Sequence, residues 1–457
     1  MKDNFKNMTV GKPERLIFGF AVPLFIGNIF QQLYSIADTM IVGHSLGEHA
    51  LASIGATLPI YFLIITFLTG SNAGYSMIVA RFFGANDMEG VKKAAGAAMI
   101  LSFVLTIVLT IVGLVMLYPM LHALGTPLEI VSDAYAYMRI LFGFMALTIL
   151  FNLSSVLLQG LGNTRTPLFF QAGAFALNIV LSFWFVAPSG LNLGVSGAAL
   201  ATIFSHSFAA VLGTVYIIKK VPALHISWEH LRPDKALLKE MFVMGASIGI
   251  GNSIISIGSV ILQTAINGFG IYTITAFTTA RKVFGITFMP LMSTANAVAT
   301  FTSQNFGAGK MERVKLGLMA GMKIACIWST LMIIMAYTVG ENIVQFMSGS
   351  QNPQVIFEAA QYLRISLPFL YALSVLMLYK SVLQGLGNKI IPVASSVIEL
   401  LGKVIATIWV VPRLQFVGVA LAEPLIWVTC SILFLFLFHY KKSDATLAFS
   451  HPKSELN

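Results

Sequence analysis

A single acidic residue, Asp38, lies deep in the first long apolar stretch of the chain. If that stretch is a helix, Gln31, Tyr34 and Asp38 fall at positions i, i+3 and i+7 and share one face. The face is polar while its neighbours are apolar, so we expect it to point into a cavity or the protein interior. A carboxyl in an apolar setting is costly while charged, and such a group can bind and release a proton near neutral pH. The pattern therefore indicates a proton-coupling role for Asp38.

The alternative is that Asp38 is a structural carboxylate, held by backbone or amide donors. A simple ion pair is hard to build, because no Lys or Arg lies in the middle of an apolar stretch in the first half of the chain. Other polar side chains at depth are available as neighbours. They come from the fourth, fifth and sixth apolar stretches and are Asn152, Asn178, Ser182, Thr202 and His206.

Two pairs in this set are four residues apart, so each pair occupies one helix face. Interhelical hydrogen bonding alone could explain such pairs, and a lone histidine is usually a packing residue. We interpret Asn178 and Thr202 as cation-coupling candidates beside Asp38. The candidates for lining a substrate cleft are Gln31, Tyr34, Asn152, Ser182 and His206.

The second half of the chain carries charges at comparable depth. Glu399 and Lys403 lie one helical turn apart, and Glu423 begins the deep part of the last apolar stretch. Aligning the two halves places Lys403 opposite Asn178 and Glu423 opposite Thr202. A charged cluster is therefore predicted where the first half has neutral donors. Two interpretations remain open, a buried ion pair that stabilises this half or a contact for substrate or ion.

The composition decides the class of protein that must position these side chains. Of 457 residues, 57% are hydrophobic and only 10% are charged, and the mean hydropathy is +0.83. Soluble domains carry about 25% charged residues, so soluble enzymes and disordered chains are excluded. The two cysteines, Cys326 and Cys430, lie in apolar stretches and give neither a disulfide framework nor a metal-ligand spacing. The chain is predicted to be a polytopic membrane protein.

Twelve apolar runs of about 20 residues are long enough to cross a bilayer as helices. They are too long and too uniformly apolar for the strands of a barrel, so an all-α membrane protein is predicted. The runs begin near Leu16, Ala50, Val91, Ile130, Pro167, Gly194, Leu238, Ile271, Val314, Ile356, Ile391 and Val417.

An internal duplication organises the twelve runs into two halves. Residues 83–92 recur at 306–315 with seven of ten positions identical, and Gln-Gly-Leu-Gly-Asn occurs at both 159–163 and 384–388. Six helices in each half give both halves the same orientation, so their pseudo-twofold axis runs along the membrane normal. We predict an N-terminal lobe at residues 1–225 and a C-terminal lobe at residues 226–457, with a central cleft for alternating access.

The net charge of +10 does not indicate nucleic acid, because Lys and Arg are spread over short loops rather than gathered in a patch. Most of them fall on one side of the predicted membrane, which places both termini in the cytoplasm of a cell (inner) membrane protein. No phosphate-binding loop is present, since the nearest candidate, residues 307–310, lacks the first glycine. Metalloprotease and nucleophile-elbow motifs are missing too, so a secondary transporter without a cofactor is predicted rather than an enzyme.

The quoted motifs, together with residues 31–44 and 52–55, resemble the multidrug and toxic compound extrusion (MATE) family over about residues 11–440. The resemblance implies a two-lobed exporter that exchanges organic, often cationic compounds for protons or sodium ions. It also implies that Asp38 is the first-helix aspartate used for coupling, with Asn178, Thr202 and Asn152 as its polar neighbours. Ser182 departs from members that have an acidic residue there. No carboxylates match those that some members carry in helices seven and ten.

Two other functions are open at this point. A flippase for a lipid-linked saccharide would have similar helices, but it would need a strongly cationic cavity, and the deep cations here are few. A receptor or structural membrane protein would need neither a matched duplication nor a deep unpaired aspartate. As partners we expect small-molecule drugs or toxic compounds and membrane lipid, and no nucleic acid. We expect the chain to act as a monomer.

Overall fold

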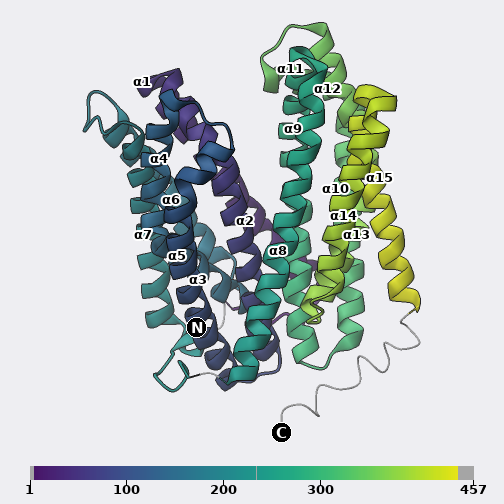
Figure 1. Ribbon diagram of the computed structural model, residues 1–457. Coiled ribbons are helices and arrows are strands. Elements are labelled where there is room, and N and C mark those ends of the chain that lie inside the picture. Colours follow the sequence, from purple (N-terminus) through teal and green to yellow (C-terminus); the bar gives the residue numbers. More distant parts are fainter. Residues whose placement is uncertain (1–4, 233, 441–457) are drawn as a thin grey trace. The chain divides into compact units, whose positions relative to one another are not determined.

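Helices are the only regular structure in the part of the chain that the computed structural model describes, residues 5–232 and 234–440 with side chains to 436 (Figure 1). The predicted all-α class is confirmed. The helices are α1 (Pro13–Leu46), α2 (Glu48–Gly84), α3 (Met88–Ala123), α4 (Leu128–Gly143), α5 (Met145–Gly160), α6 (Arg165–Val186), α7 (Gly194–Lys220), α8 (Lys235–Ile266), α9 (Ile271–Gly307), α10 (Met311–Thr338), α11 (Gly340–Ser348), α12 (Pro353–Ser366), α13 (Leu370–Gly385), α14 (Ile391–Ile405) and α15 (Val411–Tyr440).

Ten helical runs among the described residues are long and apolar enough to cross a membrane, and an eleventh arises if α4 and α5 form one span. These two helices are bent by 50° at Phe144, so the run predicted from Ile130 is broken. The run from Ile391 to Phe436 is counted once but contains two predicted spans. Its backbone leaves the helical region at Gln415 (φ 53°, ψ −133°), two residues before the predicted start at Val417. Two helices therefore meet there.

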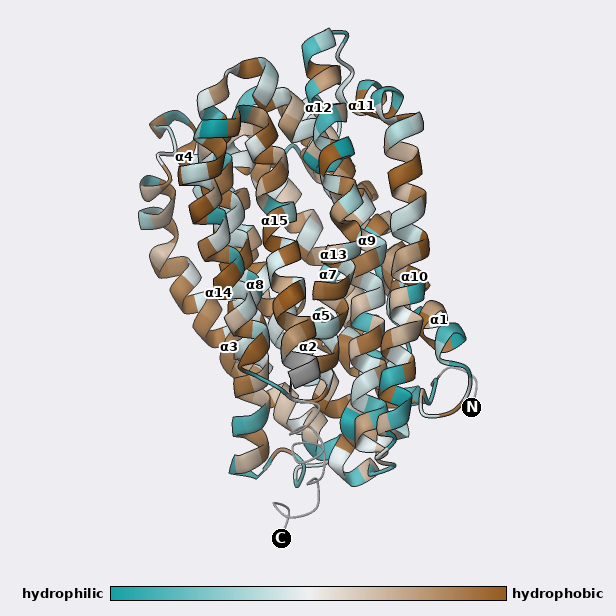
Figure 2. Cartoon of the chain, turned by 90° about the vertical axis from the view of Figure 1, so that its right-hand side faces the viewer, coloured by the Kyte–Doolittle hydropathy of each residue, from teal (hydrophilic) through white to brown (hydrophobic). Residues whose placement is uncertain are grey.

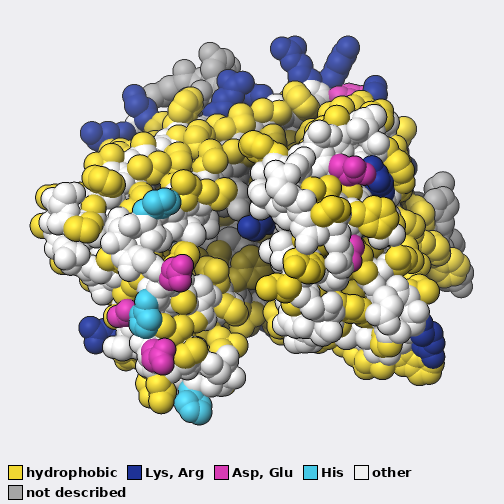
Figure 3. Space-filling view, turned by 90° about the horizontal axis from the view of Figure 1, so that it is seen from above, with side chains coloured by type: hydrophobic (Ala, Val, Ile, Leu, Met, Phe, Trp, Pro, Cys, Tyr) yellow, Lys and Arg dark blue, Asp and Glu magenta, His cyan; other side chains and the backbone are white. Residues whose placement is uncertain are grey.

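The surface has the character that a lipid environment requires. Hydrophobic residues dominate the middle of the helices, and hydrophilic residues are more frequent towards their ends (Figure 2). Seen from above, hydrophobic side chains are abundant, and many of the visible Lys and Arg lie along one edge (Figure 3). Helix α3 shows the reason, because Phe103, Ile107 and Ile111 recur on one face and remain exposed. Such a face gains nothing in water and is stable against lipid.

Two compact units account for the described residues. Unit 1 comprises residues 1–253, 299–317 and 384–389, and unit 2 comprises residues 254–298, 318–383 and 390–457. The division passes through α8, α9, α10 and the end of α13. The predicted lobe boundary between residues 225 and 226 is a different division of the sequence, and it stays a prediction.

In unit 1 the first helix is held by two later ones. Helix α6 packs against both α1 and α7, and α7 also packs against α4 and α5. Buried apolar side chains fill the space between them, among them Phe142 and Met138 of α4, Ile149 of α5 and Ile203 of α7. The polar residues predicted on α1, α5, α6 and α7 therefore lie on helices that pack together.

The duplicated motifs contact each other reciprocally within unit 1. A Cβ on Gly84 would overlap the carbonyl of Gln304, and a Cβ on Gly307 would overlap the carbonyl of Arg81. In both contacts a glycine of one motif copy meets the carbonyl three residues before the glycine of the other copy. Glycine is needed at both positions because only hydrogen allows the backbones to approach so closely. A local twofold relation between the two copies requires this arrangement.

The chain before α1 is fixed by residues in and just before the second motif copy. Gln304 accepts a hydrogen bond from the Met8 amide (2.8 Å), and Asn305 and Arg313 donate to the Met8 carbonyl (3.2 and 3.1 Å). Met8 is fully buried. The segment around Met8 is therefore part of the packed end of unit 1.

Candidate functional site

Asp38 is buried in α1, with 7% of its surface exposed. Its Oδ1 accepts a hydrogen bond from the Ser182 hydroxyl of α6 (3.0 Å). No Lys, Arg or His forms an ion pair with it in the described part of the chain. The sequence-based expectation that no cation neutralises this carboxyl therefore agrees with the geometry. The donor is a hydroxyl, whereas the structural alternative expected backbone or amide groups.

Next to Asp38, three side chains from α1, α6 and α7 form a hydrogen-bonded chain. Asn178 Nδ2 donates to the Tyr34 hydroxyl (3.4 Å), which lies within hydrogen-bond distance of the Thr202 hydroxyl. Thr202 itself donates to the Ala198 carbonyl (3.1 Å), so its hydroxyl is left to accept from Tyr34. The direction of the chain is thereby set from Asn178 through Tyr34 to Thr202.

The Asn178 side chain is completely buried, yet its Oδ1 has no hydrogen-bond partner among the described residues. Buried carbonyl oxygens are nearly always paired, because an unpaired one loses its hydration without replacement. An acceptor left open one helical turn from Ser182 can take a proton donor or coordinate a cation. We call Tyr34, Asp38, Asn178, Ser182 and Thr202 the aspartate cluster.

His206 extends this cluster towards α5. Its Nδ1 is 3.0 Å from the Thr148 hydroxyl, and its ring stacks against Phe151 and Tyr34 with centroids 5.9 and 6.5 Å away. Asn152 donates to the Thr148 carbonyl (2.8 Å). Both residues are thus near the aspartate cluster, with local partners of their own. Packing alone accounts for them as well as substrate contact does.

Gln31 lies apart from these residues. Its side chain is exposed, while Tyr34 is half-buried and Asp38 is buried. The shared helix face predicted from the spacing is present, but its buried part begins at Tyr34.

Sequence reasoning missed two tyrosines as site residues, Tyr61 of α2 and Tyr137 of α4. Both interact electrostatically with Asp38. Tyr137 is also a duplicated position, since Tyr362 occurs at the same place in the second half. That match was a signal that could have found it, whereas nothing in the sequence points to Tyr61.

In unit 2, Glu423 of α15 joins two cations. Its Oε1 is 3.0 Å from Lys403 Nζ of α14, and its Oε2 is 2.5 Å from Arg281 Nη1 of α9. Lys403 also donates to the Ser259 hydroxyl (2.9 Å). Lys403 and Glu423 were both predicted in a charged cluster, and the structure brings them together. Arg281, the second cation that contacts Glu423, was not predicted as a site residue.

Glu399 does not pair with Lys403, although the two lie one turn apart on α14. Its nearest cation is Lys380 of α13 at 3.8 Å. Lys380 also donates to Ser396 of α14 (2.9 Å). We call this second group the glutamate cluster, and its members are Arg281, Lys380, Glu399, Lys403 and Glu423.

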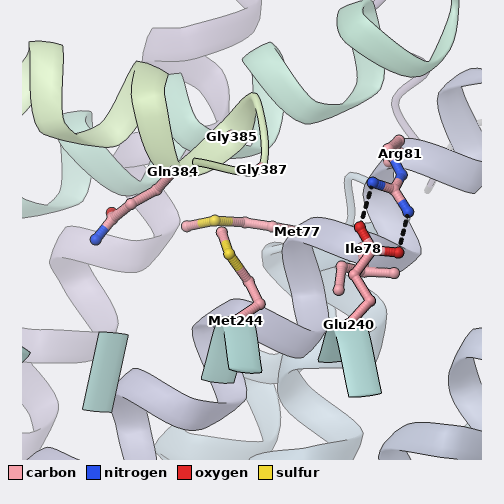
Figure 4. A pocket seen from close by; sticks show the side chains of 8 residues that line it. All are labelled: Met77, Ile78, Arg81, Glu240, Met244, Gln384, Gly385 and Gly387. Carbon is pink, nitrogen blue, oxygen red and sulfur yellow. Dashed lines mark hydrogen bonds and ion pairs between the residues drawn. The ribbon is translucent and has the colours of Figure 1, made fainter. Parts of the chain in front are cut away.

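A small pocket lies in unit 1, where the second Gln-Gly-Leu-Gly-Asn motif faces α2 and α8 (Figure 4). Met77 and Met244 fill its middle, and Arg81 forms a two-pronged ion pair with Glu240 at its side (2.7 and 2.8 Å). The pocket is too small for an organic substrate. Its features suit a closing contact between helices.

No group of three or more His, Cys, Asp or Glu side chains that could hold a metal ion occurs in the described ranges.

The family model described as MatE matches residues 23–184 and again residues 247–409. The two matched stretches are separated by nearly the same offset as the repeated motifs. The chain is 25% identical over 437 residues to "Probable multidrug resistance protein YoeA" of Bacillus subtilis, covering 93% of this chain and 94% of that protein. It is 22% identical to "Multidrug export protein MepA" of Staphylococcus saprophyticus over 81% of each chain.

Two solved structures share the fold. "Crystal structure of MATE in the bent conformation" superposes with a TM-score of 0.91 at 23% identity, covering 99% of this chain and 100% of that one. "Outward-facing conformation of a multidrug resistance MATE family transporter of the MOP superfamily" gives 0.88 at 24% identity, covering 97% and 99%.

Proposed function

Because the chain belongs to the MatE family, whose members are membrane transporters and not enzymes, we propose that it is a secondary active multidrug efflux transporter. It exports organic, often cationic compounds and takes up protons or sodium ions in exchange, by alternating access. It works as a monomer in the cell (inner) membrane with both termini in the cytoplasm. The names of relatives such as YoeA and MepA support drug-like substrates.

The observation that carries this proposal is the buried Asp38, which has a hydroxyl partner and no cation. A neutralised carboxyl in such a place costs less than a charged one, so ion binding and the local conformation are coupled. Protonation turns one carboxyl oxygen from an acceptor into a donor. The Oδ1 of Asn178, which has no hydrogen-bond partner among the described residues, can accept a hydrogen bond from such a donor or coordinate a cation.

Proton binding can then change the affinity of the aspartate cluster for a compound. Asp38 without a proton is negative and attracts an organic cation, whereas protonated Asp38 does not. Rearrangement of the chain from Asn178 through Tyr34 to Thr202 would carry the change across α1, α6 and α7. Exchange follows because cation and proton compete for the same charge.

The energy available is sufficient for a pump. One proton that moves through about 150 mV supplies roughly 3.5 kcal/mol. That free energy supports about a 300-fold gradient of a neutral compound. A pH difference across the membrane adds to it. That pH difference alone drives a one-for-one exchange of a proton for a singly charged organic cation, because this exchange moves no net charge.

The closed contact around Arg81 and Glu240 is the proposed cytoplasmic gate. It must open for a compound to enter from inside, so it should form and break in each cycle. Arg81→Gln should slow efflux several-fold, and the charge swap Arg81→Glu with Glu240→Arg should restore most of the rate. Equal loss in the single and swapped variants would argue against a gate that depends on this ion pair.

The experiment that tests the function is ethidium efflux from de-energised, loaded vesicles, restarted by an imposed pH gradient with and without sodium. Asp38→Asn is compared with Asp133→Asn, a half-buried aspartate of α4 outside the cluster. Efflux driven by protons alone, and lost only in Asp38→Asn, supports proton coupling through this residue. Efflux that requires sodium would support the exporter function but identify sodium, and not the proton, as the coupling ion. If the wild-type chain moves neither ethidium nor other cationic dyes, the drug-exporter proposal fails, and flipping of a lipid-linked saccharide is tested instead.

A further inference from the structure

The glutamate cluster contains more positive than negative groups. Arg281, Lys380 and Lys403 supply three cations, whereas Glu399 and Glu423 supply two carboxylates. No further carboxylate joins these five side chains through an ion pair in the residues that the structure describes. Arg281 lies ten residues into α9, about 15 Å along the helix from its start. An unbalanced positive charge at such a depth calls for a mobile anion.

Glu423 is shared between two cations with one oxygen for each. Oε1 contacts Lys403 and Oε2 contacts Arg281, so neither cation has both oxygens of the carboxylate. Lys403 is nearly fully buried and has Ser259 as a second partner. Its place in the network is therefore fixed. Arg281 has Tyr362 as a second partner, but its planar group carries five donors, more than Glu423 and Tyr362 use, so a further anion can bind it.

Arg281 is also the accessible member of this trio. About a third of its side chain (32%) is exposed, against 6% for Glu423 and 5% for Lys403. A guanidinium exposed to hydrocarbon at this depth would be very costly, so its open side faces water or a ligand. The rings of Phe277 and Phe284 lie 5.9 Å from its central carbon, and Trp427 stacks on Phe284. These rings are nearly fully buried (Phe277 4%, Phe284 6% and Trp427 6% exposed), so the guanidinium is the accessible group at this place.

We propose that Arg281, with Glu423 as an internal competitor, is the binding site for an anionic group of the substrate. A carboxylate or similar anion on the compound would pair with the exposed part of the guanidinium. Glu423 holds Arg281 in place when the site is empty and gives up one contact when the anion binds. The inference rests on the proposed export function and extends its substrates to compounds that carry a negative charge.

The alternative is that these residues have only a structural role. In that case Arg281 and Glu423 stabilise the helices, and the charge of a ligand is irrelevant. A matched control is available in Arg364 of α12, which is 33% exposed and paired with Glu341 at 2.9 Å. Removing either arginine breaks one ion pair in unit 2. The two arginines are similarly exposed, although Glu341 is 52% exposed and Glu423 only 6%. Only Arg281 has the aromatic surroundings and the shared carboxylate.

The test uses the full chain in lipid nanodiscs with two fluorescent probes, dansylglycine and its neutral amide, dansylglycinamide. The probes share their rings and differ in charge, and empty nanodiscs give the background from lipid. We expect Arg281→Gln to weaken dansylglycine binding at least tenfold and to leave dansylglycinamide within twofold. Arg364→Gln should change neither. Glu423→Gln should strengthen dansylglycine binding at least threefold, because the competing carboxylate is gone.

Thermal unfolding of each variant separates binding from folding. If a single variant does not fold, Arg281→Gln combined with Glu423→Gln removes the pair as a unit and should still lose dansylglycine binding. Equal binding of the two probes to the wild-type chain would overturn the proposal, as would weaker dansylglycine binding in folded Glu423→Gln. Ethidium efflux is measured in parallel. If efflux is normal and the anion site fails, only this inference is wrong, whereas absent wild-type efflux counts against the exporter itself.

Discussion

The aspartate cluster and the glutamate cluster occupy matching places in the duplicated sequence but carry different chemistry. Asn178 in the first corresponds to Lys403 in the second, and Thr202 corresponds to Glu423. One cluster holds a lone acid among neutral donors, and the other holds carboxylates already paired with cations. A lone acid changes its charge when a proton binds, whereas a paired acid resists protonation. The difference suggests that the first half senses the ion and the second half does not.

The largest expected effect is on coupling in the first half. Asp38→Asn removes the only carboxyl of the aspartate cluster, so gradient-driven ethidium efflux should fall more than 100-fold. The amide keeps the size of the side chain and can still accept from Ser182, so the melting temperature should stay close to that of the wild-type chain. Initial efflux rates and thermal unfolding in nanodiscs measure the two quantities. A variant that pumps normally would transfer the leading role to Glu399 and Glu423.

Stability should respond most strongly in the second half. Glu423→Ala leaves Arg281 and Lys403 without their shared carboxylate at depth, which should lower the free energy of unfolding by about 3–5 kcal/mol. Thermal unfolding of Glu423→Ala and of Asp38→Asn, measured side by side, compares the two clusters directly. If the two variants melt at the same temperature, the distinction between a sensing cluster and a paired cluster does not hold.

Exchanging one residue between the halves sharpens the comparison. Asn178→Lys places the second-half residue in the first half and gives Asp38 a permanent cation within reach. We expect efflux to fall about 10- to 100-fold. The positive charge introduced at position 178 keeps Asp38 ionised and repels an organic cation. Asn178→Gln, which changes length without adding charge, is the control. Efflux that stays proton-driven in Asn178→Lys would show that a lone carboxyl is not required.

The smallest expected effect concerns the single hydrogen bond to Asp38. Ser182→Ala removes a contact that contributes about 1.5–3 kcal/mol, because the acceptor is a carboxylate. Efflux should change two- to tenfold, and Ser182→Thr, which keeps the hydroxyl, should restore the rate. Rates measured over a range of pH would show whether the hydroxyl acts through Asp38. An unchanged profile in Ser182→Ala would mean that the contact has no part in coupling.

Much of the arrangement followed from the sequence because helix periodicity fixes which residues share a face. Tyr34 with Asp38, and Asn178 with Ser182, were placed together on that basis, and the structure brings both pairs into one cluster. Apolar length likewise gave the all-α membrane fold. The duplication indicated that the two motif copies matter, and their glycines do meet.

Contacts between helices could not be predicted in the same way. Spacing along α14 suggested that Glu399 and Lys403 belong together, yet Lys403 pairs with Glu423 and Glu399 with Lys380. Which partner a side chain reaches depends on the rotation and depth of the neighbouring helix, and neither is encoded in local spacing. Tyr61 was missed for that reason. The bend at Phe144 and the break at Gln415 are also backbone events inside apolar runs, where periodicity gives no signal.

The most direct test of the central claim is proton release on drug binding by the purified chain in weakly buffered solution. A pH indicator reports protons when ethidium is added without any gradient. We expect about one proton released per ethidium bound to the wild-type chain, the same from Glu423→Gln, and none from Asp38→Asn. Proton release that persists in folded, ethidium-binding Asp38→Asn would contradict the account and place the exchanged proton elsewhere.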